Sequence, residues 1–330
     1  MKKFLLQFFY FSLVPVFLIL VIEIFITCYH DLLFSEQRLE KLFKNDIVDY
    51  EWIPLLNNDS IHLLAGSSSV KYGLSCSQLN EFNPDHSCYV NMAYDARDPI
   101  ATYFILKNLD SKKISSVYMG LDPWIFAKQY YKHRNSYYYL DLNIFQTILF
   151  TFQHDKTAFL QRYKVLLSVL LNEKPIVSSI KRVVPPDFGS VALTQIPKNF
   201  DIKPIEMFQI KTFGWSDLQF TYLKKIIDYC KAKQIPFSMF IPPKRSDFIC
   251  SYKADCAEIH HDYLQLMKKY GVQAPIFGTF DQSGMDGDST YFVEGFHLNQ
   301  QGQKRYTELF YRLIQERKAV FSVEYQWYKK

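Results

Sequence analysis

The sequence predicts an α/β protein built on a parallel sheet, and three observations support this. Five short apolar segments have the length and residue types of buried strands: 61–65, 87–92, 116–121, 236–241 and 272–277. Longer amphipathic segments have the spacing of helices: 99–109, 216–233, 256–270 and 299–316. The two kinds of segment alternate for most of the chain, which implies a three-layer, flavodoxin-like arrangement with helices on both faces of the sheet.

The first element is an apolar segment near the N-terminus that is long enough to cross a bilayer. Residues 4–28 would span about 37 Å as a helix. Lys2 and Lys3 precede the segment and favour a cytoplasmic N-terminus. A cleaved signal peptide is the alternative, but the apolar segment is long for one and no small-x-small site follows it. We therefore expect a single-pass protein of the cytoplasmic (inner) membrane, with its C-terminal domain extracytoplasmic.

These features divide the chain into an anchor at 1–30, a juxtamembrane segment at 31–58 with helical spacing, and an α/β domain at 59–330. Within that domain, residues 127–214 interrupt the alternation of strands and helices. This insertion holds tyrosine clusters and two apolar helical segments, 142–152 and 156–171. We interpret it as a cap over the site, which would make it a glycan or lipid-acceptor surface; the alternative is an ordinary helical subdomain.

Composition limits the partners and cofactors that we expect. The net charge of +5 comes from intermixed acidic and basic residues without a long basic stripe, so nucleic acid is not expected as a partner. Because no Cys/His cluster has metal-ligand spacing, we expect neither a metal centre nor a cofactor. In an oxidising compartment, either of two cysteine pairs could form a disulfide: Cys76 with Cys88, or Cys250 with Cys256.

The residues that carry chemistry lie near opposite ends of the α/β domain. The strand 61–65 runs into a small-residue turn that contains Ser67, Ser68 and Ser69. More than two hundred residues later, Glu294 precedes His297 by three positions. A serine hydroxyl needs a base to become a nucleophile, and that base needs an acid to orient it. The sequence therefore contains the three groups of a serine-hydrolase triad.

The Gly-Ser-Ser turn after an apolar strand resembles the G-D-S block of the SGNH/GDSL hydrolase superfamily, whose nucleophile maps to Ser68. The D-x-x-H motif of that superfamily is similar to Glu294-x-x-His297, with glutamate in place of aspartate. Serine in place of the Asp of the block resembles the membrane-anchored branch. That branch includes the D-alanyl transfer protein of teichoic acid synthesis and the alginate O-acetylation proteins. The resemblance covers roughly residues 60–125 and 215–315. It implies Ser68 as nucleophile, His297 as general base and Glu294 as orienting acid.

The oxyanion hole departs from the superfamily pattern, in which a glycine N–H and an asparagine side chain donate to the developing charge. The comparable positions here are Ala96 and Asp122. An alanine still offers its N–H, but an ionised Asp122 has no proton to donate and would repel an oxyanion. Either backbone N–H groups of Ser68 and Ala96 form the hole with help from Asn91, or activity is weak or absent.

Two neighbouring side chains have alternative explanations. Asn91 could simply hold its own turn in place rather than donate to an oxyanion. Arg97 could assist at the site, or it could pair with Asp95 or Asp98. The residue types alone leave both questions open.

The resemblance implies a membrane-anchored serine acyltransferase or esterase that acts on acyl groups of an envelope polysaccharide. Its partners would then be the membrane, an envelope glycan and a multi-spanning membrane acyltransferase. The alternative is a non-catalytic subunit of the same fold that binds glycan or presents it to such an acyltransferase. A plain carboxylesterase is a further alternative.

Overall fold

The computed structural model divides into two compact units. One holds Met1–Asn45 and Lys132–Val177, and the other holds Asp46–Tyr131 and Ser178–Lys330. The structure describes residues 2–29, 33, 35–43, 50, 52–56, 58, 60–83, 87–95, 97–127, 143–153, 156, 158–171, 184–194, 214–245, 253–274, 276–277, 285 and 289–316.

The second unit is organised around a parallel sheet with strand order β2-β1-β3-β4-β5. Its strands are β1 (Ser60–Ala65), β2 (Ser87–Asn91), β3 (Ile114–Gly120), β4 (Phe237–Phe240) and β5 (Ile276–Phe277). β1 lies between β2 and β3 and pairs in parallel with both. This is one of the two common doubly wound strand orders, and its topological switch point lies between β1 and β3. The expected α/β class with a parallel sheet is confirmed.

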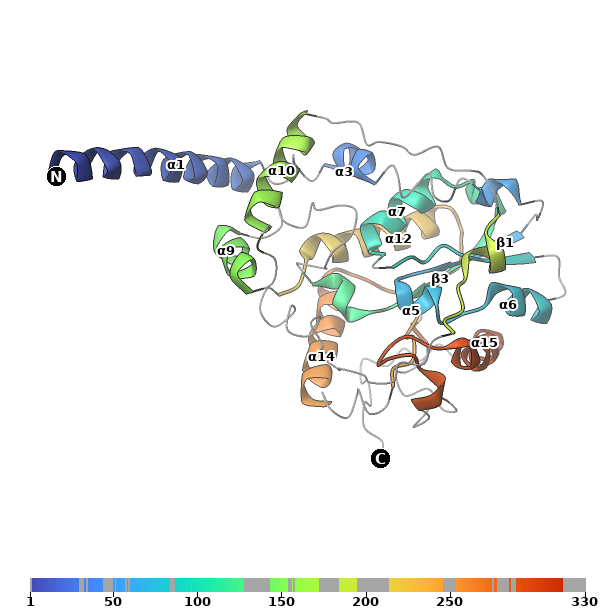
Figure 1. Ribbon diagram of the computed structural model, residues 1–330. Helices are drawn as coiled ribbons and strands as arrows, with labels where there is room; N and C mark the ends of the chain where they lie inside the picture. Colours follow the sequence, from blue (N-terminus) through green and yellow to red (C-terminus); the bar gives the residue numbers. More distant parts are fainter. Residues whose placement is uncertain are drawn as a thin grey trace. The chain divides into compact units, whose positions relative to one another are not determined.

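Helices cover both faces of the sheet (Figure 1). On one face lie α7 (Pro99–Asn108), α12 (Asp217–Ala232) and α14 (Lys253–Lys269). On the other lie α5 (Ser68–Lys71), α6 (Cys76–Phe82) and α15 (Gln300–Gln315). Short 3₁₀ segments complete this unit: η1 (Ile53–Leu55), η2 (Ser111–Lys113), η3 (Pro123–Phe126), η4 (Pro186–Gly189) and η5 (Ser289–Tyr291).

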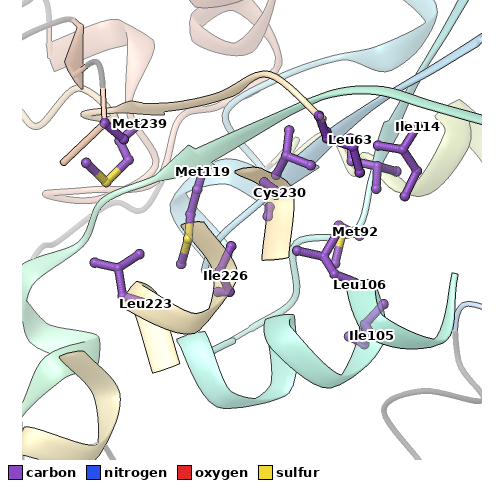
Figure 2. Packing of buried hydrophobic residues seen from close by; sticks show 14 of the residues in the cluster. Leu63, Met92, Ile105, Leu106, Ile114, Met119, Leu223, Ile226, Cys230 and Met239 are labelled. Carbon is purple, nitrogen blue, oxygen red and sulfur yellow. The ribbon is translucent and has the colours of Figure 1, made fainter. Parts of the chain in front are cut away.

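The alternation of strand side chains separates two cores. Leu63 and Met119 face α7 and α12, where they pack with Leu106 and Ile226 (Figure 2). The next residue of β1, Leu64, belongs to the opposite core, which α6 and α15 cover. Neighbouring strand positions are apolar on both faces, which is the pattern expected for a central strand of a doubly covered parallel sheet.

The first unit contains the helices of the N-terminal segment and of the predicted insertion: α1 (Lys2–Cys28), α3 (Glu36–Leu42), α9 (Ile144–Gln153) and α10 (Ala158–Leu171). Within α1, Phe9–Cys28 is long and apolar enough to cross a membrane. α9 and α10 contact each other. These two helices therefore belong to the same compact unit as the apolar N-terminal helix, whereas the later part of the insertion, 184–194, belongs to the α/β unit.

A half-buried histidine in β1 gives a first testable prediction. The ring nitrogens of His62 lie 2.7 Å from the Ser116 hydroxyl and 3.2 Å from the Ser87 hydroxyl, and its ring stacks on Tyr89. Burial lowers the pKa of His62 below 6.5, so the unfolded chain binds a proton more readily than the folded one. Stability should therefore fall as pH drops below about 6.5. The free energy of unfolding of His62→Gln, measured from pH 5 to 8, should show a smaller loss at the acidic end than the wild type. An equal loss in both would contradict this role.

Candidate active site

The candidate site lies where the strands end at the topological switch point. The serine turn follows β1, Asp122 follows β3 by two residues, and Lys244 follows β4 by four. In open α/β sheets, ligands bind at this carboxyl edge of the strands. Residues far apart in the sequence therefore share one edge of the sheet.

Two glycines allow the ends of β1 and β3 to approach closely. Gly66 has a φ of +142°, and a Cβ there would lie 2.6 Å from Cγ2 of Val70. A Cβ on Gly120 would lie 2.2 Å from the same methyl group. Only glycine combines this backbone conformation with so little space. The serine turn can therefore lie directly against the end of β3.

The serine turn begins a short helix, and its three hydroxyls have different environments. Ser67 is the N-cap of α5 and accepts from the N–H of Ser69 at 3.4 Å. Ser67 and Ser69 are 2% and 4% exposed. Ser68, the first residue of α5, is only half-buried. Within the described part of the chain, no hydrogen bond occupies the Ser68 hydroxyl.

A buried ion pair holds the other two serines. The Ser67 hydroxyl donates to one carboxylate oxygen of Asp122, and Nζ of Lys244 donates to the other at 2.6 Å. The same ammonium donates to Oγ of Ser69 at 3.2 Å. Both charged side chains are 2% exposed. The pair thus joins the ends of β1, β3 and β4 beneath the serine turn.

The charge state of Asp122 follows from these contacts. Burial alone would raise the pKa of its carboxyl, but the Lys244 ammonium and the hydroxyls of Ser67 and Ser69 together hold that pKa below 3.8. Asp122 is therefore ionised at neutral pH, with its charge compensated by Lys244. Its contribution to stability is present above the unfolded-state pKa and is lost as pH falls through the lower folded-state value.

Glu294 and His297 lie in a tight loop before α15. The loop is closed by an antiparallel bridge between Phe292 and Leu298 and by a 2.8 Å hydrogen bond from the N–H of Val293 to the carbonyl of His297. Within the loop, a carboxylate oxygen of Glu294 contacts Nδ1 of His297. A carboxylate can only accept, so in the neutral form of the ring Nδ1 carries the proton and the lone pair is on Nε2. Nε2 is buried, and no described residue is a hydrogen-bond partner for it.

Backbone and ring contacts bring this loop to the serine turn. The N–H of Arg245 donates to the carbonyl of Gly295 at 2.8 Å, which joins the loop to the segment after β4. The ring of His297 lies edge-on to that of Tyr72, with centroids 5.2 Å apart. Tyr72 is four residues after Ser68, and its N–H donates to the Ser68 carbonyl at 2.9 Å. Positions four apart share a helix face, so His297 lies on the side of α5 that carries Ser68.

Asp95 holds the end of α5 in place. Its carboxylate accepts from Nζ of Lys71 at 3.1 Å. Burial and a hydrogen bond to Asp95 raise the pKa of Tyr72, so the phenol stays protonated beside the His297 ring.

The side chain of Asn91 is held by three hydrogen bonds within the protein. Its Nδ2 donates to the carbonyl of Val70 at 3.1 Å and to the Ser190 hydroxyl at 3.2 Å, and its Oδ1 accepts from the N–H of Ala93 at 3.0 Å. These contacts agree with the alternative that Asn91 holds its turn in place. They also bring the 184–194 segment against α5, where the N–H of Val191 donates to the carbonyl of Lys71.

Two further residues were expected near the oxyanion, Ala96 and Arg97. Ala96 lies outside the described residues. Arg97 is 3% exposed, donates to the Tyr50 hydroxyl at 3.1 Å and packs over the rings of Tyr50 and Tyr94. These contacts favour neither of the two roles expected for Arg97.

Cys76 and Cys88, one of the two pairs that could form a disulfide, are both free, buried thiols in the structure. Cys76 begins α6, where its N–H donates to Ser190 at 3.2 Å, and Cys88 lies in β2 within reach of the Asn80 amide. Burial raises the pKa of both thiols. Cys250 lies outside the described residues, as does the side chain of Cys256.

Lys244 is the site residue that the sequence analysis missed. The predicted strand 236–241 is followed by Pro242 and Pro243, and Lys244 comes directly after them. An acidic residue two positions after a buried strand needs a compensating cation, because an unpaired buried carboxylate is costly. A search for that cation at the other strand ends would have pointed to Lys244.

No protein-family model matches the chain, and no curated protein matches it significantly.

Proposed function

We propose that this protein is a membrane-anchored serine acyltransferase or esterase of the SGNH type, in which Ser68, His297 and Glu294 form the catalytic triad. The observation that carries the proposal is the state of His297. Glu294 occupies Nδ1, while Nε2 stays without a described partner in a ring that packs one helical turn from Ser68. A general base for a serine nucleophile needs a Nε2 that is free to take the hydroxyl proton; Nε2 makes no hydrogen bond to Ser68 in the structure, and the proposal requires the two to meet when substrate binds.

The contacts of the three hydroxyls support Ser68 over its neighbours. Ser67 donates to Asp122, and Ser69 accepts from Lys244. Both hydroxyls are buried and contribute to holding the turn. The half-buried Ser68 hydroxyl has no such bond in the described part of the chain, so it is available to substrate. This argument is independent of the family resemblance.

In the proposed reaction, Oγ of Ser68 attacks the carbonyl carbon of an ester while Nε2 of His297 takes its proton. The tetrahedral intermediate collapses as the ester C–O bond breaks, and the imidazolium returns the proton to the leaving alkoxide. The acyl group now rests on Ser68. A sugar hydroxyl or water then attacks the acyl carbon while Nε2 of His297 takes its proton. The bond between the acyl carbon and Oγ of Ser68 breaks, and His297 returns the proton to Oγ. Glu294 keeps the proton of His297 on Nδ1 and stabilises the imidazolium.

Lys244 compensates the negative charge of Asp122, which would otherwise repel an oxyanion at the serine turn. The Lys244 ammonium binds Asp122 directly at 2.6 Å, so the pair adds no net charge at the serine turn. In this proposal the pair positions the turn and the oxyanion is stabilised by other groups. The expected candidates remain the N–H groups of Ser68 and Ala96.

The proposal is tested by incubating the full chain in detergent with an aryl acetate, alone and with an added envelope oligosaccharide. An acyltransferase should move acetate to the oligosaccharide and release aryl alcohol faster when the acceptor is present. An esterase should release acetate at a rate that the acceptor leaves unchanged. A folded protein that does neither would contradict the proposal.

Glu294→Gln is expected to lower turnover by roughly 10²- to 10⁴-fold, because the amide no longer holds the His297 tautomer or stabilises its charged form. The expected loss is in kcat, since Glu294 orients the base rather than binding substrate. Glu308→Gln, on the exposed side of α15, is the matched control and should keep wild-type kinetics. Equal activity of Glu294→Gln and wild type would remove Glu294 from the triad.

One observation favours a non-catalytic alternative. Both oxygens of Asp122 accept hydrogen bonds from the protein, so the position where the superfamily has an asparagine offers no side-chain donor to substrate. In this alternative the protein binds an envelope glycan or presents it to a multi-spanning acyltransferase. Retained binding of the oligosaccharide by a chain that turns over no ester would favour it.

A further inference from the structure

The helix α9 has its apolar side exposed. Its exposed positions, spaced three or four apart, form one stripe: Phe145 (80%), Ile148 (39%), Leu149 (40%) and Phe152 (84%). The side of α9 that is buried contains Thr147, which is 0% exposed. α9 also contains no charged residue. This is the reverse of the distribution expected for a helix that faces water.

The neighbouring helix α10 also exposes apolar side chains, with Lys164 among them on the same stripe, while Val165 and Leu166 are buried. Leu160, Leu167 and Leu171 are 72%, 56% and 68% exposed. Arg162 in the same helix is 1% exposed. Because α9 and α10 contact each other, the two stripes belong to one helical hairpin, which we call the apolar hairpin (144–171).

An ion pair attaches the apolar hairpin to α1. Arg162 donates from Nε and from a terminal nitrogen to the two carboxylate oxygens of Glu23, at 2.9 and 2.6 Å. The Tyr163 hydroxyl donates to the same carboxylate at 3.0 Å. The two-point contact explains both the buried arginine and an acidic residue within the apolar span.

The position of Glu23 in α1 indicates how deep this ion pair would lie in a bilayer. Glu23 is five residues before Cys28, where the apolar span ends, which corresponds to about 7.5 Å along a helix axis. That is the depth of the boundary between headgroups and acyl chains if α1 spans a bilayer. Tyrosine is enriched at the same level, which fits the contact of Tyr163 with Glu23.

We propose that the exposed face of the apolar hairpin docks into the membrane–water interface beside α1 and contacts phospholipid acyl chains. If α1 spans the bilayer, its exposed apolar side chains, such as Phe17 (66% exposed), contact lipid, and the exposed apolar side chains of the apolar hairpin belong to the same compact unit. Glu23–Arg162 joins the two surfaces at interfacial depth, and Lys164 is exposed on α10, where it can extend toward headgroups. The proposal rests on α1 as the anchor and is independent of the acyl chemistry at Ser68.

Photo-crosslinking of the full chain tests this proposal. A benzophenone amino acid replaces Phe145 or Phe152 in protein reconstituted into vesicles of phosphatidylethanolamine and phosphatidylglycerol whose acyl chains carry an alkyne tag. Phe17 in α1 is the lipid-facing control, and Lys231, exposed on α12, is the water-facing control. The benzophenone side chain is larger than phenylalanine, but all four positions are exposed, and size-exclusion chromatography checks that each variant remains folded.

After illumination, positions 145 and 152 should form tagged-lipid adducts at a level close to that of position 17, with little adduct at position 231. Lipid adducts at 17 but not at 145 and 152 would overturn hairpin docking while keeping the anchor. The loss of lipid adducts at all three would overturn both. In native membranes, a protein adduct at 145 and 152 without a lipid adduct would show that a protein partner covers the face, which also overturns the proposal.

Discussion

Replacing Ser68 by alanine should lower ester turnover by roughly 10³- to 10⁶-fold and leave the fold intact, because the variant lacks the proposed nucleophile. The Ser68 hydroxyl makes no hydrogen bond to the described residues, so its removal leaves no buried partner unsatisfied. The measurement is kcat/KM for an aryl acetate, with thermal unfolding as a check that the variant is folded.

Ser77→Ala is the matched control for this prediction. Ser77 is an exposed residue of α6, nine positions after Ser68, and the same substitution there should change neither turnover nor stability. Wild-type turnover in Ser68→Ala would contradict the assignment of the nucleophile. If Ser67→Ala or Ser69→Ala instead lost activity while remaining stable, the nucleophile would be one of those residues.

Lys244→Met should lower the free energy of unfolding at neutral pH by about 3–5 kcal/mol. The substitution keeps a long side chain but leaves the carboxylate of Asp122, which is 1% exposed, without its cation. Burial would then raise the pKa of Asp122 rather than being offset, so the loss of stability should shrink as pH falls and the carboxyl takes up a proton. Chemical denaturation at several pH values measures both effects.

The double variant Lys244→Met/Asp122→Asn tests the cause of this loss. It removes both charges and leaves an amide oxygen that can accept from Ser67. We expect it to regain most of the stability that Lys244→Met loses. If the double variant were as unstable as the single one, the loss would arise from the missing lysine packing and not from an uncompensated carboxylate.

Much of the fold could be predicted because it depends on local patterns. The segment 61–65 is short and apolar, and Gly66 ends it, so both the strand and the sharp turn follow from neighbouring residues. α12 begins next to Ser216, as its N-capping preference predicts, although the serine side chain makes no capping hydrogen bond. β5 covers only Ile276–Phe277, whereas the sequence predicted a strand over 272–277. An apolar segment indicates that its residues are buried, but it does not indicate how many of them pair with a neighbouring strand.

The site was less predictable because its contacts connect distant strands. Glu294 and His297 could be found from their own spacing, and the structure places them in one loop with their side chains in contact. Nothing local to Lys244 indicates that it contacts Asp122, since the two lie 122 positions apart. The same reason explains Arg162, whose partner Glu23 lies 139 positions earlier. Such pairs follow from topology and from the cost of an unpaired buried charge.

Mapping of a fluorophosphonate adduct tests the central claim most directly. The folded, full-length protein is treated with the reagent, digested, and its peptides are sequenced by mass spectrometry. A Ser-His-Glu triad predicts an adduct on Ser68, with labelling that becomes much slower in His297→Ala because the base that activates the serine is gone. A well-folded protein that remains unlabelled at Ser68, or that carries the adduct on another residue, would contradict the claim that Ser68, His297 and Glu294 form a working catalytic triad.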